Sequence, residues 1–406
     1  MIRSYVSLLQ KEHRILAFGM LLTFFSSFGQ TFFISLFVPA WEKEFALGSG
    51  TFGSLYSLAT LMSAAVLPIA GRLVDTMDLR RFTLGVGAVL ASGCAALSFA
   101  ANWWHLLILL FALRLSGQGL CGHIASTTMA RRFQRERGKA LSISALGFPV
   151  GEGILPTLGI IALATWGWRT TSLVDGGIVV LVMMPIAFGL LSPPKFRQPP
   201  TMDSHATPVD VVEKEWTRQH VLRDWRFYCL LPGLLNIPFA VTGLIIHQVR
   251  LAEFKGWTMA NLAFAFAGFA VARVFCSLLV GPAIDRWGAR RIFPWIGLPM
   301  AFGIGLLLMM DSPWTALIYL SLMGGSMGLA SGTGSALWAE LYGVRHLGAI
   351  KSLGSSMAIL GTALSPALFG WILGAGTSFH WILIGTIALT LLTAVVSLPV
   401  CLKKGL

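Results

Sequence analysis

The sequence predicts an all-α membrane protein with twelve transmembrane helices in two repeated halves. Its composition, the spacing of its apolar runs and a charged loop that occurs twice support this prediction. Of the 406 residues, 55% are hydrophobic and 12% are charged, whereas a soluble domain carries about 25% charged residues. So few charges cannot cover the surface of a chain this long in water, and lipid is therefore the expected solvent for most of it.

Twelve apolar runs are long enough to cross a bilayer. A transmembrane helix needs about 20 apolar residues, because the hydrocarbon core is ~30 Å thick and a helix rises ~1.5 Å per residue. The predicted spans are 15–40, 51–70, 82–101, 105–129, 138–164, 171–191, 227–249, 257–280, 292–310, 313–338, 348–374 and 379–402. The first run is longer than the core of a signal peptide, about 7–15 residues, so we expect it to be a span.

The positions of Lys and Arg orient these spans. Four of the 30 Lys and Arg residues lie in loops on one side, two lie within spans, and the others lie on the opposite side. The four are Lys43, Arg169, Arg250 and Lys255. This bias predicts cytoplasmic amino and carboxyl termini in a multi-pass plasma membrane protein, with a bacterial inner membrane as its expected location. Short basic clusters between spans indicate anionic lipid head groups as partners, and we expect no nucleic-acid binding despite the net charge of +13.

A charged loop occurs twice, half the chain apart. The segment GRLVDTMDLRR occupies 71–81, and GPAIDRWGARR occupies 281–291, 210 positions later. Gly138 and Gly348 recur at the same offset, as do Pro156 and Pro366. Independent landmarks at one offset indicate a duplicated six-span half, which is typical of secondary transporters whose binding site lies between the repeats.

Both loops resemble the signature Gly-x-x-x-Asp-(Arg/Lys)-x-Gly-(Arg/Lys)-(Arg/Lys) of the major facilitator superfamily. The second copy is the fuller, and the first has Thr76 and Asp78 where Arg and Gly are usual. The resemblance implies two pseudo-symmetric six-helix bundles around a central cavity, at 1–191 and 227–406, joined by a cytoplasmic linker at 192–226. The segment ARRFQRERGKALSISALGFPVGEGILP at 130–156, followed by GWR at 167–169, looks most similar to the monocarboxylate and oxalate/formate porter branch.

The resemblance also implies a conformational latch, which forms in one state of an alternating-access cycle and breaks in the other. The matching residues are Gly71, Asp75, Arg80, Arg81, Gly281, Asp285, Arg290 and Arg291, with Arg137 and Arg345 as the expected loop partners. The alternative is that these charges only set topology and cap helices. That alternative is weaker for the aspartates, because topology depends mainly on Lys and Arg.

Ionisable residues within spans are candidates for a functional site, because each costs about 2.5–3.5 kcal/mol at a helix centre. Arg114 and Glu152 lie at similar predicted depths, ~14 and ~18 Å below the outer face, and they can pair. The pair is either a permanent ion pair or a proton site in which Glu152 titrates and Arg114 senses its charge. Arg273 would then lack an acidic partner within a span, and a guanidinium that faces a cavity favours an anionic substrate.

Polar side chains near the middle of other spans are further candidates for substrate binding. They are Gln30, Tyr56, His123 and Asn236. A single polar residue within a membrane more often makes a hydrogen bond between helices than a ligand contact, so both interpretations stay open for each of them.

The sequence predicts no catalysis, no cofactor and no metal site. GQGLCG at 117–122 matches a dinucleotide-binding pattern, but it lies within a span and follows no strand. The five cysteines have neither CxxC nor metal-type spacing. The chain contains no HExxH, GxSxG or Walker loop, so we expect neither an enzyme nor ATP-driven transport.

These observations predict a monomeric secondary active transporter for a small organic anion, mono- or dicarboxylate-like, that works by proton symport or by exchange for a counter-substrate. The main alternative is proton-coupled efflux of a drug-like compound, because GFPVGEG at 147–153 partly resembles the fifth-span signature of antiporters. A membrane receptor or membrane-embedded enzyme is a remote alternative, since the central loop is too short for a receptor domain.

Overall fold

The computed structural model describes residues 2–133, 136–192, 216–343 and 347–402. Throughout these ranges the regular secondary structure is helical, without strands. Contacts divide the chain into two compact units: unit 1 comprises Met1–Leu47 and Leu58–Thr207, and unit 2 comprises Gly48–Ser57 and Pro208–Leu406. The first turns of α4 (Ser49–Gly71) thus group with unit 2, while the rest of that helix belongs to unit 1.

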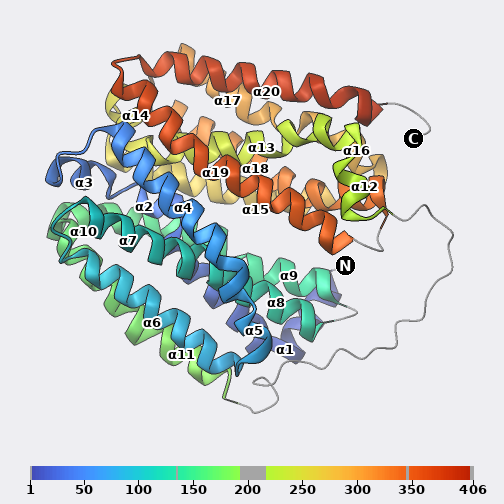
Figure 1. Ribbon diagram of the computed structural model, residues 1–406, viewed down its shortest axis with the longest axis horizontal. Helices are drawn as coiled ribbons and strands as arrows, with labels where there is room; N and C mark the ends of the chain where they lie inside the picture. Colours follow the sequence, from blue (N-terminus) through green and yellow to red (C-terminus); the bar gives the residue numbers. More distant parts are fainter. Residues whose placement is uncertain (1, 134–135, 193–215, 344–346, 403–406) are drawn as a thin grey trace. The chain divides into compact units, whose positions relative to one another are not determined.

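Figure 1 labels the α-helices up to residue 190, and short 3-10 and π-helices lie between some of them. In chain order they are α1 (Ile2–Phe25), the 3-10 helix η1 (Ser26–Gly29), α2 (Thr31–Ile34), α3 (Val38–Glu44), α4 (Ser49–Gly71), α5 (Leu73–Thr76), α6 (Leu79–Leu97), α7 (Trp103–Leu113), the π-helix η2 (Arg114–Cys121), α8 (Gly122–Arg132), α9 (Arg137–Ala145), α10 (Gly147–Ile178), the π-helix η3 (Val179–Met183) and α11 (Met184–Leu190). Within unit 1, α6 packs along α10, and α1 packs against α8, α9 and α10.

The helices after residue 216 belong to unit 2. They are α12 (Arg218–Leu222), α13 (Trp225–Ile246), α14 (Gln248–Phe254), α15 (Met259–Trp287), α16 (Ala289–Ile292), the 3-10 helix η5 (Phe293–Trp295), α17 (Leu298–Met309), α18 (Pro313–Tyr342), α19 (Leu347–Gly374) and α20 (Phe379–Leu402). Here α15 packs along α18 and α13 along α19 (Figure 1). Gly324 and Gly328 on α18 permit this packing, because a Cβ at either position would collide with a carbonyl oxygen of α15.

These helices form the twelve predicted spans in two six-helix bundles. Nine segments of the described chain are long and apolar enough to cross a membrane. One of them, Gly138–Leu190, has 53 residues, which is enough for two crossings. Gly167 lies between those crossings with φ of 73°, a conformation that favours glycine. The long helices α6 and α18 complete the twelve.

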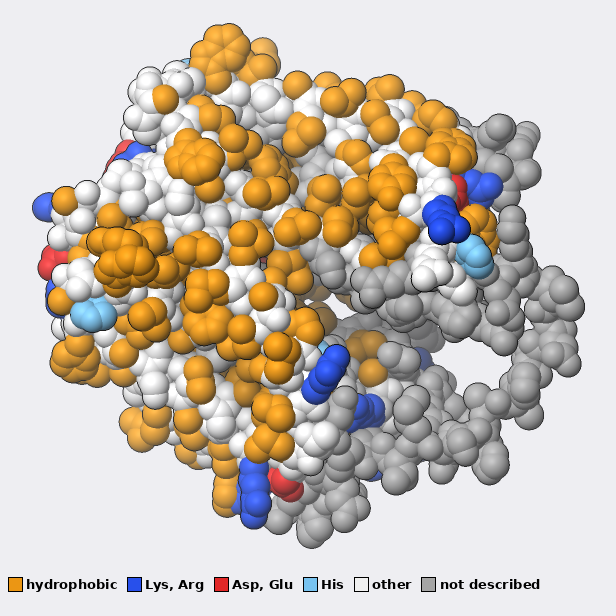
Figure 2. All heavy atoms as spheres, viewed as in Figure 1, with side chains coloured by type: hydrophobic (Ala, Val, Ile, Leu, Met, Phe, Trp, Pro, Cys, Tyr) orange, Lys and Arg blue, Asp and Glu red, His pale blue; other side chains and the backbone are white. Residues whose placement is uncertain are grey.

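Large apolar side chains cover the outside of these helices. Leu181, Met309 and Trp314 are 77%, 83% and 66% exposed. Hydrophobic side chains dominate the face shown in Figure 2, with Lys, Arg, Asp and Glu in a few small groups. Soluble proteins rarely expose apolar patches of this extent, so this surface faces lipid and the chain is a multi-pass membrane protein.

Polar contacts fasten the loops on the side predicted to be external. In unit 1, the Arg169 guanidinium lies 2.9 Å from Glu44 and donates to the Ser98 carbonyl over 2.7 Å. In unit 2, the Lys255 ammonium binds the Asp311 carboxylate, and the Trp257 indole donates to the Asp311 carbonyl over 2.8 Å. Each bundle thus has its own polar fastening at this end.

Candidate functional site

The predicted first span, 15–40, is broken in its middle. Helix α1 begins at Ile2, ends at Phe25 and passes into η1; Gln30 is then extended, with φ of −86° and ψ of 152°. The Ser26 hydroxyl donates to the Thr23 carbonyl over 2.7 Å, a side-chain hydrogen bond of the kind that bends helices. The break lies at Ser26, Ser27 and Gly29, which are weak helix formers.

Arg114 fastens this break. Its Nη1 donates to the Gly29 carbonyl over 3.2 Å and to the Thr31 hydroxyl over 3.5 Å, and its Nε donates to the Thr60 hydroxyl over 3.2 Å. The side chain is only 1% exposed. A guanidinium presents donors in a fixed planar fork, so one residue holds η1, α2 and α4 together.

The fourth span changes its winding at the same level. Arg114 is the first residue of the π-helix η2, and π-helical turns occur frequently at functional sites. Gly117 in η2 lies against Gly29, and a Cβ at Gly117 would be 2.8 Å from the Gly29 Cα. Two glycines therefore let the backbones of the first and fourth spans touch, which brings Arg114 within reach of Gly29.

Glu152 lies next to the same break. It is on α10 and is 7% exposed, and the preceding Gly151 packs directly against the Ser27 hydroxyl of η1. Glu152 and Arg114 both have further interactions within the structure. An ion pair between the two stays a prediction.

The other predicted binding residues have varied surroundings. Gln30 is half-buried at the break itself. Tyr56 is fully buried, with its ring centroid 6.5 Å from that of Phe52, and lies in the part of α4 that groups with unit 2. Arg273 on α15 is half-buried and interacts with other parts of the protein. Its guanidinium is therefore not free, and its role in substrate binding stays a prediction.

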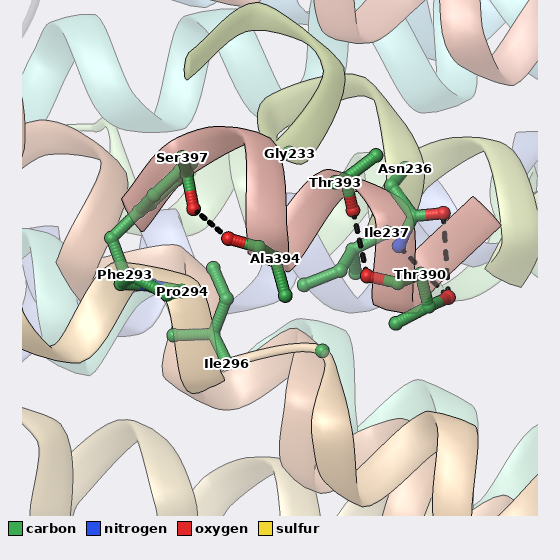
Figure 3. Close-up of a pocket in the computed structure, with 11 residues that line it drawn as sticks. Gly233, Asn236, Ile237, Phe293, Pro294, Ile296, Thr390, Thr393, Ala394 and Ser397 are labelled. Atoms are coloured by element: carbon green, nitrogen blue, oxygen red, sulfur yellow. Dashed lines mark hydrogen bonds between the residues drawn. The ribbon is translucent and has the colours of Figure 1, made fainter. Parts of the chain in front are cut away.

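Asn236 lines a small cavity inside unit 2. Its amide nitrogen donates to the Thr390 hydroxyl over 3.1 Å, which joins α13 to α20 (Figure 3). The cavity, of about 10 Å³, is also lined by Thr393 and Ser397. Their hydroxyls donate to the carbonyls of Thr390 and Ala394, so the polar groups around Asn236 are satisfied by the protein. This geometry fits a hydrogen bond between helices.

A family model matches nearly the whole chain. The model described as "Major Facilitator Superfamily" matches residues 19–265 and 239–403, which include the broken first span, η2 and both charged loops. The chain belongs to the Major Facilitator Superfamily. It is therefore a transporter rather than an enzyme.

Curated relatives within the superfamily are similar over most of the chain. Monocarboxylate transporter 6 of Homo sapiens is 26% identical over 86% of this chain and 72% of its own length. The gentisate transporter of Corynebacterium glutamicum is 25% identical over 86% and 79%. The oxalate:formate antiporter of Oxalobacter formigenes is 24% identical over 78% and 76%. The monocarboxylate transporter and the oxalate:formate antiporter agree with the branch that the segment at 130–156 indicates.

Solved structures of transporters share the fold. A bacterial homologue of the human lysosomal transporter Spinster superposes with a TM-score of 0.65 at 16% identity, covering 96% of both chains. A point mutant of the nucleoside transporter NupG gives a TM-score of 0.73 at 10% identity, covering 96% of this chain and 100% of its own. The predicted major facilitator fold is thus confirmed.

The first charged loop of this superfamily member is fixed by local contacts. Asp78 caps α6 by accepting the Arg81 backbone N–H over 2.9 Å, which explains an Asp where the signature has Gly. The Arg80 guanidinium lies 3.0 Å from the Phe188 ring centroid. His123 Nε2 donates to the Gly71 carbonyl over 3.2 Å, so this predicted binding residue contacts the loop.

In the second charged loop, a backbone N–H is capped by a residue from another helix. Gly288 has φ of 81°, and Glu340 on α18 accepts the Arg290 backbone N–H over 3.2 Å. The Arg290 guanidinium donates to the Val400 carbonyl over 2.7 Å. Glu340 makes a contact that the sequence did not predict, since it lies 50 residues from Arg290.

The structure describes only some of the other predicted latch residues. Gly281 and Asp285 are exposed, and Arg291 is on α16. The side chains of Asp75 and Arg137 lie outside the described part of the structure, and so does all of Arg345.

Asp175 is a further ionisable residue within a span. It lies on the second crossing of α10 and is 8% exposed. Its position inside the predicted span 171–191 is the sequence signal for it, although the three charges considered above do not include it. With Asp175 added, Glu152 is not the sole acidic candidate for a role in the membrane.

Proposed function

We propose that this transporter moves a small organic anion, mono- or dicarboxylate-like, by alternating access, as a proton symporter or as an exchanger. The observation that carries the proposal is the placement of two buried ionisable side chains, Arg114 and Glu152, on the elements that pack around the broken first span. Broken helices form the substrate and ion sites of many secondary transporters, because they leave backbone groups to bind a ligand.

Three features of the chain support an anionic substrate. Arg273 is half-buried on α15, and a guanidinium binds carboxylate groups with paired hydrogen bonds. Gln30 is the extended residue at the break, and its side-chain amide can donate a hydrogen bond. The relatives named above include transporters whose names specify monocarboxylate, gentisate, oxalate and formate. In this proposal Gln30 and Arg273 are candidates for substrate binding, each within its own unit, and Glu152 exchanges a proton.

Uptake by the purified full chain in proteoliposomes tests the proposal. Radiolabelled oxalate, formate, lactate and gentisate are offered with and without an imposed pH gradient. We expect at least one of them to accumulate or to exchange against internal unlabelled anion, with faster accumulation when the outside is acidic. Failure of all of them, together with gradient-driven movement of tetraphenylphosphonium, would replace the anion proposal by the drug-efflux alternative.

We also propose that the two charged loops act as a latch on the side expected to be cytoplasmic. Asp78 accepts from the Arg81 backbone in the first loop, and Glu340 accepts from the Arg290 backbone in the second. These contacts hold each loop in one conformation, which a latch would exchange for a second one. The variant Asp75→Asn should slow transport several-fold and leave the concentration for half-maximal uptake nearly unchanged. An affinity that falls as far as the rate would instead place Asp75 in the binding site.

A further inference from the structure

Asp175 is buried at a place where an ionised carboxylate is poorly solvated. The residue lies ~12 Å along α10 from the turn at Gly167, at ~1.5 Å per residue. Its side chain is 8% exposed, and within the described residues no hydrogen bond or ion pair engages its carboxyl. A buried charge without such compensation carries a large desolvation penalty, and the group then tends to become neutral.

The carboxyl lines a small cavity with an aromatic wall. Phe28, Phe33, Phe37 and Trp41 from the broken first span form most of that wall, and Cys94 on α6 and Ser172 on α10 are also part of the lining. The helices α6 and α10 are fixed here, because a Cβ at Gly176 would lie 2.8 Å from the Ala91 carbonyl oxygen. Asp175 and the aromatic residues of the broken first span therefore line the same cavity.

The size of the cavity limits what it binds. Its volume is about 10 Å³, and by this measure a single water needs roughly 10–15 Å³. The Ser172 hydroxyl already donates to the Trp168 carbonyl over 2.8 Å, and the other lining side chains have no oxygen ligands. A sodium ion needs several oxygens, and an organic cation needs more space, so a proton is the ligand that fits.

Few other titratable or charged side chains near the cavity could bind a proton in place of Asp175. Cys94 on α6 is the other titratable side chain in its lining, while η1, α2, α3 and α7 contribute Phe, Ile, Trp and Leu. Arg114 follows the lining residue Leu113, but its guanidinium is directed to Gly29, Thr31 and Thr60. Glu42 follows Trp41 and is not among the lining residues.

We propose that Asp175 is a proton-binding site of the transport cycle, protonated while its aromatic cavity is closed and deprotonated when movement of the broken first span admits water. The carboxylic acid releases its proton to water as hydronium, and the carboxylate takes a proton back before the cavity closes. The proposal deepens the proton-coupled transport proposed above and rests on it for its role in the cycle, but the site itself is testable without a substrate.

Infrared difference spectra of the purified protein between acidic and alkaline pH provide that test. The wild type should show the C=O stretching band of a protonated carboxylic acid that persists well above the pH at which exposed carboxyls ionise. The part of this band that belongs to Asp175 should disappear in Asp175→Asn, remain in Glu152→Gln and shift in Asp175→Glu. In Cys94→Ser, the pH at which half of the band is lost should be lower, because a hydroxyl stabilises the neighbouring carboxylate. Persistence of the whole band in Asp175→Asn would overturn the proposal.

A transport measurement then tests the coupling role. With radiolabelled oxalate as the probe, Asp175→Asn should lose acceleration by a pH gradient and should keep exchange at equal pH within a few-fold of the wild type. Gradient-driven uptake that is unchanged in this variant contradicts the coupling role. If the wild type moves no anion but the infrared band behaves as expected, the proposed substrate class fails and the proton site stands.

Discussion

The Arg114 guanidinium donates to the Gly29 carbonyl over 3.2 Å, which joins the start of a π-helix in the fourth span to the end of the 3-10 turn in the first. A break in a transmembrane helix exposes backbone groups that lipid cannot satisfy. Here a side chain from a neighbouring span satisfies one of them. The break and Arg114 therefore depend on each other.

Replacement of Arg114 by lysine tests this dependence. A lysine has one ammonium and cannot replace both Nε and Nη1 of the planar fork, so Gly29 and Thr60 lose a partner. We expect a loss of about 1–3 kcal/mol in stability, seen as a lower unfolding temperature, and a fall in uptake of at least about tenfold, or ~1.4 kcal/mol. Arg132→Lys is the control, because its ion pair with Glu12 is at the surface and should change little.

Thr60 tests the same network from its acceptor side. Thr60→Val keeps the shape of the side chain but leaves the Arg114 Nε without its acceptor, at an expected cost of about 1–3 kcal/mol. Thr60→Ser keeps the hydroxyl and should lie close to the wild type. Thermal unfolding of the three proteins side by side measures the difference. Equal stability of the Val and Ser variants would show that the 3.2 Å contact contributes nothing.

A methyl group at Gly117 should separate the first and fourth spans. Its Cβ would lie 2.8 Å from both the Cα and the N of Gly29, so the two backbones must move apart and Arg114 must lose Gly29. We expect Gly117→Ala to unfold at a lower temperature, by about 1–3 kcal/mol as for other overpacked sites. Gly85→Ala is the matched control, since no atom lies within 4 Å of a Cβ at that position. Similar behaviour of both variants would contradict the close approach.

Asn236 is expected to stabilise unit 2 without contacting the substrate. A double-mutant cycle with Asn236→Leu and Thr390→Val should give a coupling free energy of about 0.6 kcal/mol, the average for hydrogen bonds between transmembrane helices. The concentration for half-maximal uptake should stay within about twofold in each variant, because a coupling of this size changes an equilibrium by less than about threefold. A large change in that concentration for Asn236→Leu alone would instead indicate that Asn236 binds the substrate.

The ion pair between Lys255 and Asp311 should make stability depend on pH. The Lys255 ammonium, through its hydrogen bond and its charge, lowers the pKa of the Asp311 carboxyl, which lies in a loop outside the spans. A carboxyl with a lowered pKa stabilises the fold above its unfolded value of about 3.9, and that contribution is lost as the pH falls through the lowered folded value. Unfolding temperatures of wild type and Asp311→Asn should therefore differ above pH ~3.9 and converge as the pH falls from there to below the lowered folded pKa.

Much of the fold follows from the sequence alone. Twelve apolar runs, the bias of Lys and Arg and the two charged loops at one offset determine the number of spans, the two halves and the family. These features suffice because a bilayer admits few backbone structures other than a helix that satisfies its own hydrogen bonds. Length and hydropathy then determine where each helix runs.

The contacts at the candidate functional site could be found only from the tertiary structure. Arg114 and Glu152 were evident as intramembrane charges, but no local pattern shows that Arg114 binds Gly29, Thr31 and Thr60, residues 54 to 85 positions away. The same holds for Glu340, which caps the second loop, and for the aromatic side chains around Asp175. Apolarity determines that a segment is buried in lipid or protein, whereas the partner of a buried polar group depends on which helices pack together. That packing is decided by close contacts such as Gly29 on Gly117, which exist only in the folded chain.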